Sequence, residues 1–198
     1  MKDLQEFEQN TKFQIVVRTS KDLFYRYGIR RVTIGEICQK ANVSKMTFYK
    51  FFSNKMDLVK YLLNKIFDQG LADYNAIMAQ RIPFREKVEK VIQLKMEQTE
   101  SLSQEFLQEL MQNPDPSIAE IMDERRKQTF QIVMDSLVKA QKNGDLRKEI
   151  KPEFIMYMLN HLIEMTNDKR LNAIFENPQE MFMELTSFFF YGILEKKK

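Results

Sequence analysis

The chain has 198 residues, of which 43% are hydrophobic and 30% are charged, and its formal net charge is +3. These values are typical of a folded globular protein and argue against a disordered chain. No apolar run approaches the roughly 18 residues of a membrane span, and five glycines and five prolines are too few for a turn-rich all-β fold. The polar N-terminus shows no signal-peptide pattern and the single cysteine suits a reducing compartment, so we expect a cytoplasmic protein.

Apolar side chains at three-and-four spacing predict a first helix from about residue 13 to Tyr27, ended by Gly28 in a left-handed conformation. Thr33 and Glu36 form a T-x-x-E capping box, which predicts the start of a short second helix. Asn42 is the expected turn residue after it, because Asn tolerates positive φ better than most residues.

Ser44 is expected to cap a third helix whose apolar side carries Phe48, Phe51 and Phe52, and a fourth helix extends to about residue 79. Farther along, the prolines and glycines separate helices at about 84–96, 102–111 and 117–143. Pro152 and Pro178 open two strongly apolar helices. No segment shows the period-two alternation of a strand, so the sequence predicts an all-α fold of about nine helices.

Positive charge is concentrated near the N-terminus: residues 1–54 carry a balance of +5 and the remainder −2. A compact basic segment on a near-neutral body indicates a phosphate-binding surface. Ordinary solvated lysines and arginines would give the same count, so charge alone leaves both interpretations open.

Three helices, the last two short and joined by a tight turn, have the geometry that places one helix in a DNA major groove. Thr33 and Ser44 stand at helix N-termini, where backbone amides favour a phosphate. The polar residues of the third helix face away from its phenylalanines, and the next helix begins with a lysine that could reach the DNA backbone. These residues are Lys45, Thr47, Tyr49, Lys50 and Lys55.

The run from Ile15 to Leu62 resembles the N-terminal domain of the TetR family of bacterial repressors. The matching segments are L-F-Y-R-Y-G at 23–28, V-T-I-G-E-I-C-Q-K-A-N-V-S at 32–44 and K-M-T-F-Y-K-F-F-S-N-K-M-D-L at 45–58. The rest of the chain is similar to the family only in length, helix content and an apolar last helix. The resemblance implies a helix-turn-helix DNA-binding domain over residues 1–54 and a helical-bundle ligand-binding and dimerisation domain over 55–198.

Carried over position by position, the resemblance implies DNA contacts of two kinds. Phosphates would be contacted by Thr33, Ser44, Tyr49 and Lys55, and base edges would be approached by Lys45, Met46, Thr47 and Lys50. Two positions depart from the family pattern: Asn42 replaces the turn glycine, and Met46 replaces a small residue at the start of the recognition helix. A bulkier side chain at position 46 puts the operator sequence in doubt, but not DNA binding.

Flexible thioether and aromatic side chains in the body predict a pocket for a small hydrophobic effector. The expected lining residues are Phe67, Met96, Met111, Met122, Phe130, Tyr157 and His161. The last two helices are apolar over wide arcs, which favours burial against a second copy, although they could instead close the monomer core. The expected dimer residues are Met158, Leu162, Met165, Leu185, Phe188 and Phe189.

Three other kinds of site receive less support. His161 and Glu164 form an H-x-x-E pair, but a bundle metal site normally needs two histidines and the chain has one, so we expect no metal and no cofactor. Cys38 could be a redox sensor, yet a buried small hydrophobe is the more common role of a cysteine. We find no nucleophile–His–acid set and no glycine-rich phosphate loop, so we do not expect an enzyme.

The sequence therefore predicts a homodimeric, ligand-responsive repressor that binds a near-palindromic operator and is released by a small hydrophobic molecule. The main alternative is a regulator of the same fold that is controlled by a protein partner.

Overall fold

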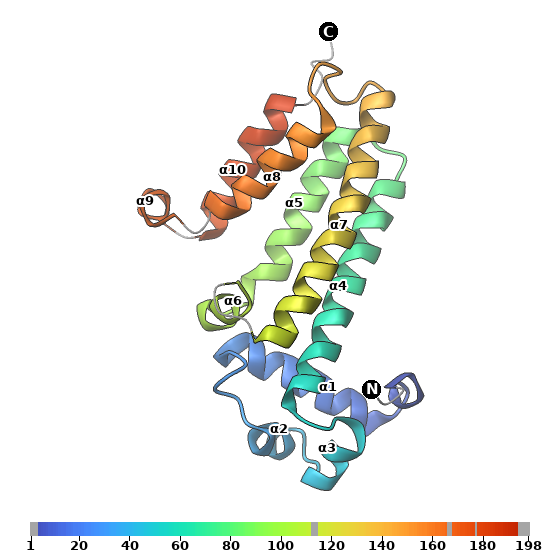
Figure 1. Cartoon of the computed structure of the whole chain (residues 1–198), viewed down its shortest axis with the longest axis vertical. Helices are drawn as coiled ribbons and strands as arrows, with labels where there is room; N and C mark the ends of the chain where they lie inside the picture. Colours follow the sequence, from blue (N-terminus) through green and yellow to red (C-terminus); the bar gives the residue numbers. More distant parts are fainter. Residues whose placement is uncertain (1–3, 112–114, 166–167, 177, 194–198) are drawn as a thin grey trace. The chain divides into compact units, whose positions relative to one another are not determined.

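The computed structural model describes residues 4–111, 115–165, 168–176 and 178–193, and these residues form helices and loops without a β-strand (Figure 1). The elements are η1 (Leu4–Phe7, a 3₁₀ helix), α1 (Thr11–Tyr27), α2 (Ile34–Lys40), α3 (Lys45–Phe51), α4 (Lys55–Ala79), α5 (Phe84–Glu100), α6 (Gln104–Met111), α7 (Pro116–Lys142), α8 (Pro152–Met165), α9 (Lys169–Asn172) and α10 (Pro178–Ile193). The predicted all-α class is confirmed. In the described part of the chain, η1 and α9 are additional to the predicted helices, because four-residue elements are too short to show a period. None of the described helices has both the length and the apolarity to cross a membrane.

The chain divides into two compact units. The first comprises Met1–Gly70 and Ser101–Arg125, and the second comprises Leu71–Glu100 and Arg126–Lys198. The boundaries fall inside α4 and α7 and after α5, so they differ from the division at residue 54 expected from the sequence. That expected division concerns function and stays a prediction.

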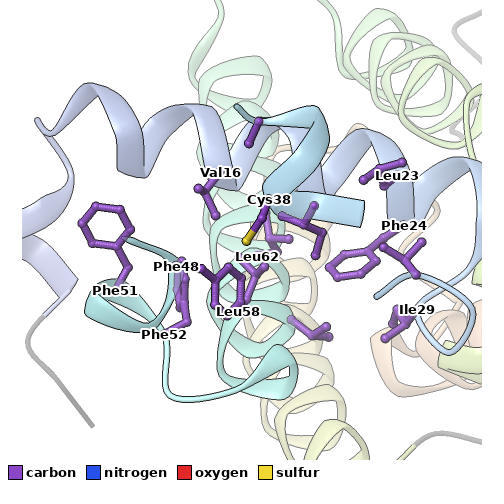
Figure 2. Close-up of a cluster of buried hydrophobic side chains, with 14 of the residues drawn as sticks. Val16, Leu23, Phe24, Ile29, Cys38, Phe48, Phe51, Phe52, Leu58 and Leu62 are labelled. Atoms are coloured by element: carbon purple, nitrogen blue, oxygen red, sulfur yellow. The ribbon is translucent and has the colours of Figure 1, made fainter. Parts of the chain in front are cut away.

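The first unit is built on an aromatic core (Figure 2). The Phe13 ring of α1 lies edge-on to Phe51, with centroids 5.3 Å apart, and stacks on Phe52 at 5.4 Å. Ser20 is buried in the same helix, and its hydroxyl donates to the Val16 carbonyl at 2.7 Å. This interior fixes α1, α2, α3 and the first turns of α4 as one body.

Local capping signals read from the sequence are confirmed. Gly28 ends α1 with φ of +80°, and Asn42 has φ of +51° in the turn between α2 and α3. The capping box at the start of α2 forms between Thr33 and Glu36, and Ser44 caps α3 by accepting a hydrogen bond from the Thr47 amide. Each rule acts over at most four residues, which is why one sequence is enough to predict it.

The second unit has its own core, formed by residues of α5, α7, α8 and α10, among them Val88 and Ile155, and by Leu146 of the segment between α7 and α8. Helices α8 and α10 both contribute to this core, and they begin at Pro152 and Pro178, as predicted.

Candidate nucleic-acid interface

Helix α3 has one buried and one exposed face. Phe48 and Phe51 are buried, whereas Met46 is 85% exposed and Tyr49 is 48% exposed. Lys45 and Lys50 are exposed beside them. The apolar Met46 side chain, in the first turn of this short helix, is not buried by the protein itself. This face is therefore available to a partner.

The start of α3 is held by its own hydroxyl groups. The Ser44 Oγ accepts from the Thr47 amide at 3.1 Å and lies 3.0 Å from the Thr47 hydroxyl oxygen. Ser44 is exposed and Thr47 is half-buried. The pair fixes the first turn of α3, where base-contacting side chains of a recognition helix lie.

The start of α2 is already occupied by a carboxylate. The amide and the hydroxyl of Thr33 both donate to Glu36 Oε2, at 2.8 and 3.0 Å, and these hydrogen bonds lower the pKa of the Glu36 carboxyl. A DNA phosphate at this point would have to displace Glu36 from the donors that it uses. The geometry therefore gives less support to the phosphate contact expected of Thr33 than to the contacts expected from α3.

Lys55, at the first position of α4, points to the protein backbone. Its ammonium donates to the carbonyls of Ile29 at 2.8 Å, Arg30 at 3.2 Å and Val32 at 2.9 Å. An ammonium group has three protons, so these three acceptors use its full donor capacity. Burial lowers the pKa of Lys55, and a nearby carboxylate, Glu109, partly opposes that shift. In place of the phosphate contact expected from the sequence, the geometry favours a structural role for Lys55.

The opposite edge of the same loop is held by α6, which sequence reasoning did not identify. Glu109 Oε2 accepts from the amides of Ile29 at 2.5 Å and Arg30 at 3.0 Å. A Cβ at Gly28 would lie 2.9 Å from Glu109 Oε1, so the carboxylate approaches closely because Gly28 has no side chain. The Ser103 amide donates to the Tyr25 carbonyl at 2.8 Å, which fastens the start of α6 to α1.

The fold and the exposed face of α3 agree with the comparison to known families. Residues 16–62 match the family described as bacterial regulatory proteins, tetR family. Over this segment the chain is similar to the TetR family. It is similar to the uncharacterised HTH-type transcriptional regulator YhgD of Bacillus subtilis (strain 168), with 20% identity over 148 residues, which cover 74% of this chain and 77% of YhgD. The family and the relative that it matches are described as regulatory proteins of transcription.

Two solved structures share the fold over nearly the whole chain. The fatty acid degradation regulator FadR from Bacillus halodurans has a TM-score of 0.73 and 14% identity, covering 93% of this chain and 97% of FadR. The regulatory protein TetR from Rhodobacter sphaeroides has a TM-score of 0.73 and 17% identity, covering 93% of this chain and all of that one. At these identities the likeness establishes the fold alone.

The residues predicted to line a ligand pocket do not gather at a hollow within either unit. Phe67, Met96 and Met122 are half-buried, whereas Phe130 and Tyr157 are exposed. The side chain of Met111 lies outside the described residues. The His161 ring contacts Tyr157, with centroids 4.3 Å apart, and its Nδ1 lies 2.6 Å from Glu164 Oε2, so the H-x-x-E pair is an interaction within α8.

Each unit, as far as the structure describes it, has a small hollow. The one in the first unit has a cavity volume of about 10 Å³ and is lined by Lys21, Phe24, Tyr25, Val59, Leu62, Leu63, Ile66 and Phe106. The one in the second unit has a cavity volume of about 20 Å³ and is lined by Arg85, Val88, Glu89, Ile92, Ser187, Phe190 and Tyr191. Each has room for about one water molecule, far below the roughly 300–1,000 Å³ of typical ligand sites, and neither is lined by the predicted residues. The location of the effector pocket stays a prediction.

The single cysteine is part of the domain core. Cys38 is buried in α2 (Figure 2), and burial raises the pKa of its thiol. A raised pKa lowers the thiolate fraction, which favours the small-hydrophobe role over redox sensing.

The residues predicted for dimerisation differ in exposure. Phe188 of α10 is 83% exposed and Met165 of α8 is exposed, whereas Met158, Leu162 and Leu185 are half-buried. Phe189 is also half-buried, and its ring contacts Phe190 with centroids 5.5 Å apart. In this unit, α8 and α10 therefore carry both core residues and large apolar side chains in solvent.

Proposed function

We propose that this regulator binds its operator by inserting α3 into the major groove, with residues 1–54 as the DNA-binding domain and 55–198 as the ligand-binding and dimerisation domain. The observation that carries the proposal is the exposed face of α3, on which Lys45, Met46, Tyr49 and Lys50 lie opposite a buried phenylalanine face. An α-helix fits the major groove, and side chains on its exposed face reach base edges.

Two kinds of DNA contact, to base edges and to phosphates, are proposed for this face. Lys45, Met46 and Lys50, with Thr47 beside them, are placed to approach base edges, and the unbranched Met46 thioether suits an apolar contact with a thymine methyl group. Ser44 and the Tyr49 hydroxyl are placed to contact phosphates. The basic segment around them supplies the sequence-independent attraction to the DNA backbone.

The test is a set of binding curves on a duplex obtained by in vitro selection with the full-length protein. We expect Lys50→Ala to weaken binding about 5- to 150-fold, because a good base contact contributes about 1–3 kcal/mol of discrimination. Lys148→Ala is the matched control, since this exposed lysine lies in the second unit. Equal affinity of the wild type and Lys50→Ala, at every salt concentration, would contradict the proposed interface.

The regulator acts in the cytoplasm as a homodimer whose two α3 helices read a near-palindromic site. The support is the apolar surface of α8 and α10, where Phe188, Tyr157 and Tyr191 are each more than half exposed. Sedimentation measurements on Phe188→Asp test this. We expect the variant to be a monomer that binds DNA weakly, whereas Ile174→Asp, at an exposed apolar residue outside these two helices, should stay dimeric. A dimeric Phe188→Asp would argue against this interface.

The proposed mode of action is repression relieved by a small hydrophobic effector bound in the body. The apolar composition of the second unit supports this, and structural neighbours include FadR and the ketosteroid transcriptional regulator KstR2 of Mycobacterium tuberculosis. An effector can shift the protein only through different affinities for its two conformations. A compound that raises the melting temperature and also releases DNA supports the effector. If no compound of any apolar class does so, control by a protein partner is favoured.

A further inference from the structure

The loop between α1 and α2 is held along both of its polar edges. Its carbonyls at Ile29, Arg30 and Val32 accept from Lys55 of α4, and its amides at Ile29 and Arg30 donate to Glu109 of α6. Both helices contribute these groups from within the first unit.

One carboxylate oxygen of α6 accepts both of these amide hydrogen bonds. Both amides converge on Glu109 Oε2, at 2.5 and 3.0 Å, and the other oxygen faces the Cα of Gly28. Gly28 serves two purposes here, because its φ of +80° is unfavourable for other residues and a Cβ would collide with the carboxylate. The loop conformation and the position of α6 are therefore set together.

The loop leads directly into the two helices of the proposed DNA-binding surface. Thr33 caps α2 at the end of the loop, α2 contacts α3, and Ile37 of α2 and Phe48 of α3 are buried in the same core. A change in the loop backbone changes where α2 begins, and α3 is attached to α2 by a turn of only four residues.

We propose that Glu109 is a positioning residue for DNA binding: its carboxylate anchors the backbone of the α1–α2 loop, and the anchor ties the placement of α2 and α3 to the position of α6. The inference rests on the proposed function of α3, but the anchor itself is measured without DNA. Movement of α6 away from the loop would remove the acceptor from two amides and loosen the start of α2.

Conservative substitutions separate the acceptor role from the charge. Glu109→Gln removes the charge but keeps the side-chain length and one acceptor oxygen. One oxygen is sufficient, because both loop amides donate to the same atom. Glu109→Asp keeps the charge and is one methylene too short to reach. The anchor predicts that Gln preserves function and that Asp loses it, whereas a purely electrostatic role predicts the reverse order.

The experiment uses the full-length protein and two measurements, amide hydrogen exchange without DNA and affinity for the selected duplex. We expect Glu109→Asp and Glu109→Ala to speed exchange at Ile29 and Arg30 and to weaken DNA binding about tenfold, the size expected when hydrogen bonds to a charged group are lost. Glu109→Gln should stay within about threefold of the wild type in both measurements. Glu105→Ala removes a carboxylate from an exposed position of the same helix and serves as the control.

Two results would overturn the proposal: unchanged exchange at Ile29 and Arg30 in Glu109→Asp, or faster exchange with unchanged DNA affinity. If Glu109→Ala does not fold, the comparison of Gln with Asp still decides, since both are polar and close in size to Glu. If selection with the wild-type protein yields no duplex that it binds, while its loop amides are protected, the proposed interface is refuted but the anchor stays intact.

Discussion

Replacing Lys55 with methionine keeps the length of the side chain and removes the ammonium that contacts three loop carbonyls. The bonds to Ile29 and Val32 are partly buried and the bond to Arg30 is exposed. Water can replace the exposed partner, so the loss is concentrated in the other two. At about 1–1.5 kcal/mol each, the expected loss of unfolding free energy is about 2–3 kcal/mol.

For a chain of 198 residues, this loss corresponds to a decrease in melting temperature of about 4–12 °C. DNA affinity should fall as well, because the loop precedes α2. The dependence of affinity on salt, in contrast, should stay that of the wild type, because no phosphate contact is removed. If Lys55 instead bound a phosphate in each protomer of a dimer, the slope of log K against log salt would become smaller by about 1.8.

The assay is therefore a salt titration of DNA binding, paired with thermal unfolding. Lys50→Met is the positive control, since Lys50 lies on the exposed face of α3 and its loss should reduce the slope if it neutralises a phosphate. A Lys55→Met variant with an unchanged melting temperature and a reduced salt slope would refute the structural role and restore the phosphate contact expected from the sequence.

Three further outcomes are expected. Gly28→Ala should lose about 1–3 kcal/mol more stability in urea unfolding than Gly144→Ala. Both glycines have φ of +80°, but a Cβ at Gly28 would meet the Glu109 carboxylate, whereas nothing lies within 4 Å of a Cβ at Gly144. Equal losses of stability would mean that α6 moves aside without an energetic cost. Burial, together with the charge and hydrogen bond of a nearby glutamate, raises the pKa of Tyr61 to about 12. The free energy of unfolding should therefore fall as pH rises from 10 to 12, because this tyrosine ionises first in the unfolded chain. Tyr61→Phe should remove one late step from the ultraviolet titration of the tyrosines. Hydrogen bonds lower the pKa of Glu36. Its stabilising effect is therefore present above the ordinary carboxyl pKa and is lost as pH falls through the lowered pKa of the folded state. The stability difference between the wild type and Glu36→Gln should vanish in acid, and a difference that stays constant with pH would contradict this.

The sequence is sufficient where a structural rule depends on neighbouring residues. Gly28 and Asn42 have the positive φ values predicted from residue type, and the Thr33–Glu36 capping box forms as expected. The exposed and buried faces of α3 also result from helical period alone. These features are those of a helix-turn-helix, which is why the resemblance to the TetR family is visible in the N-terminal residues.

The sequence is insufficient where a contact joins distant parts of the chain. Lys55 and Ile29 are 26 positions apart, and Glu109 and Ile29 are 80 positions apart. A lysine at the start of a helix near basic residues has two plausible acceptors, a DNA phosphate and a protein carbonyl, and residue type cannot distinguish them. The predicted pocket residues rest on side-chain chemistry alone, which explains why Phe130 and Tyr157 are exposed.

The two groups that hold the α1–α2 loop cannot act independently. Lys55 contacts the carbonyls and Glu109 the amides of the same peptide segment, and Glu109 also opposes the lowering of the Lys55 pKa by burial. Residues that share partners in this way have non-additive effects on stability. If α6 withdraws its carboxylate, the loop loses one edge of its support and Lys55 loses a nearby negative charge. A local change at α6 therefore weakens both attachments of the segment that leads into α2, and it does so without requiring any change in α3 itself.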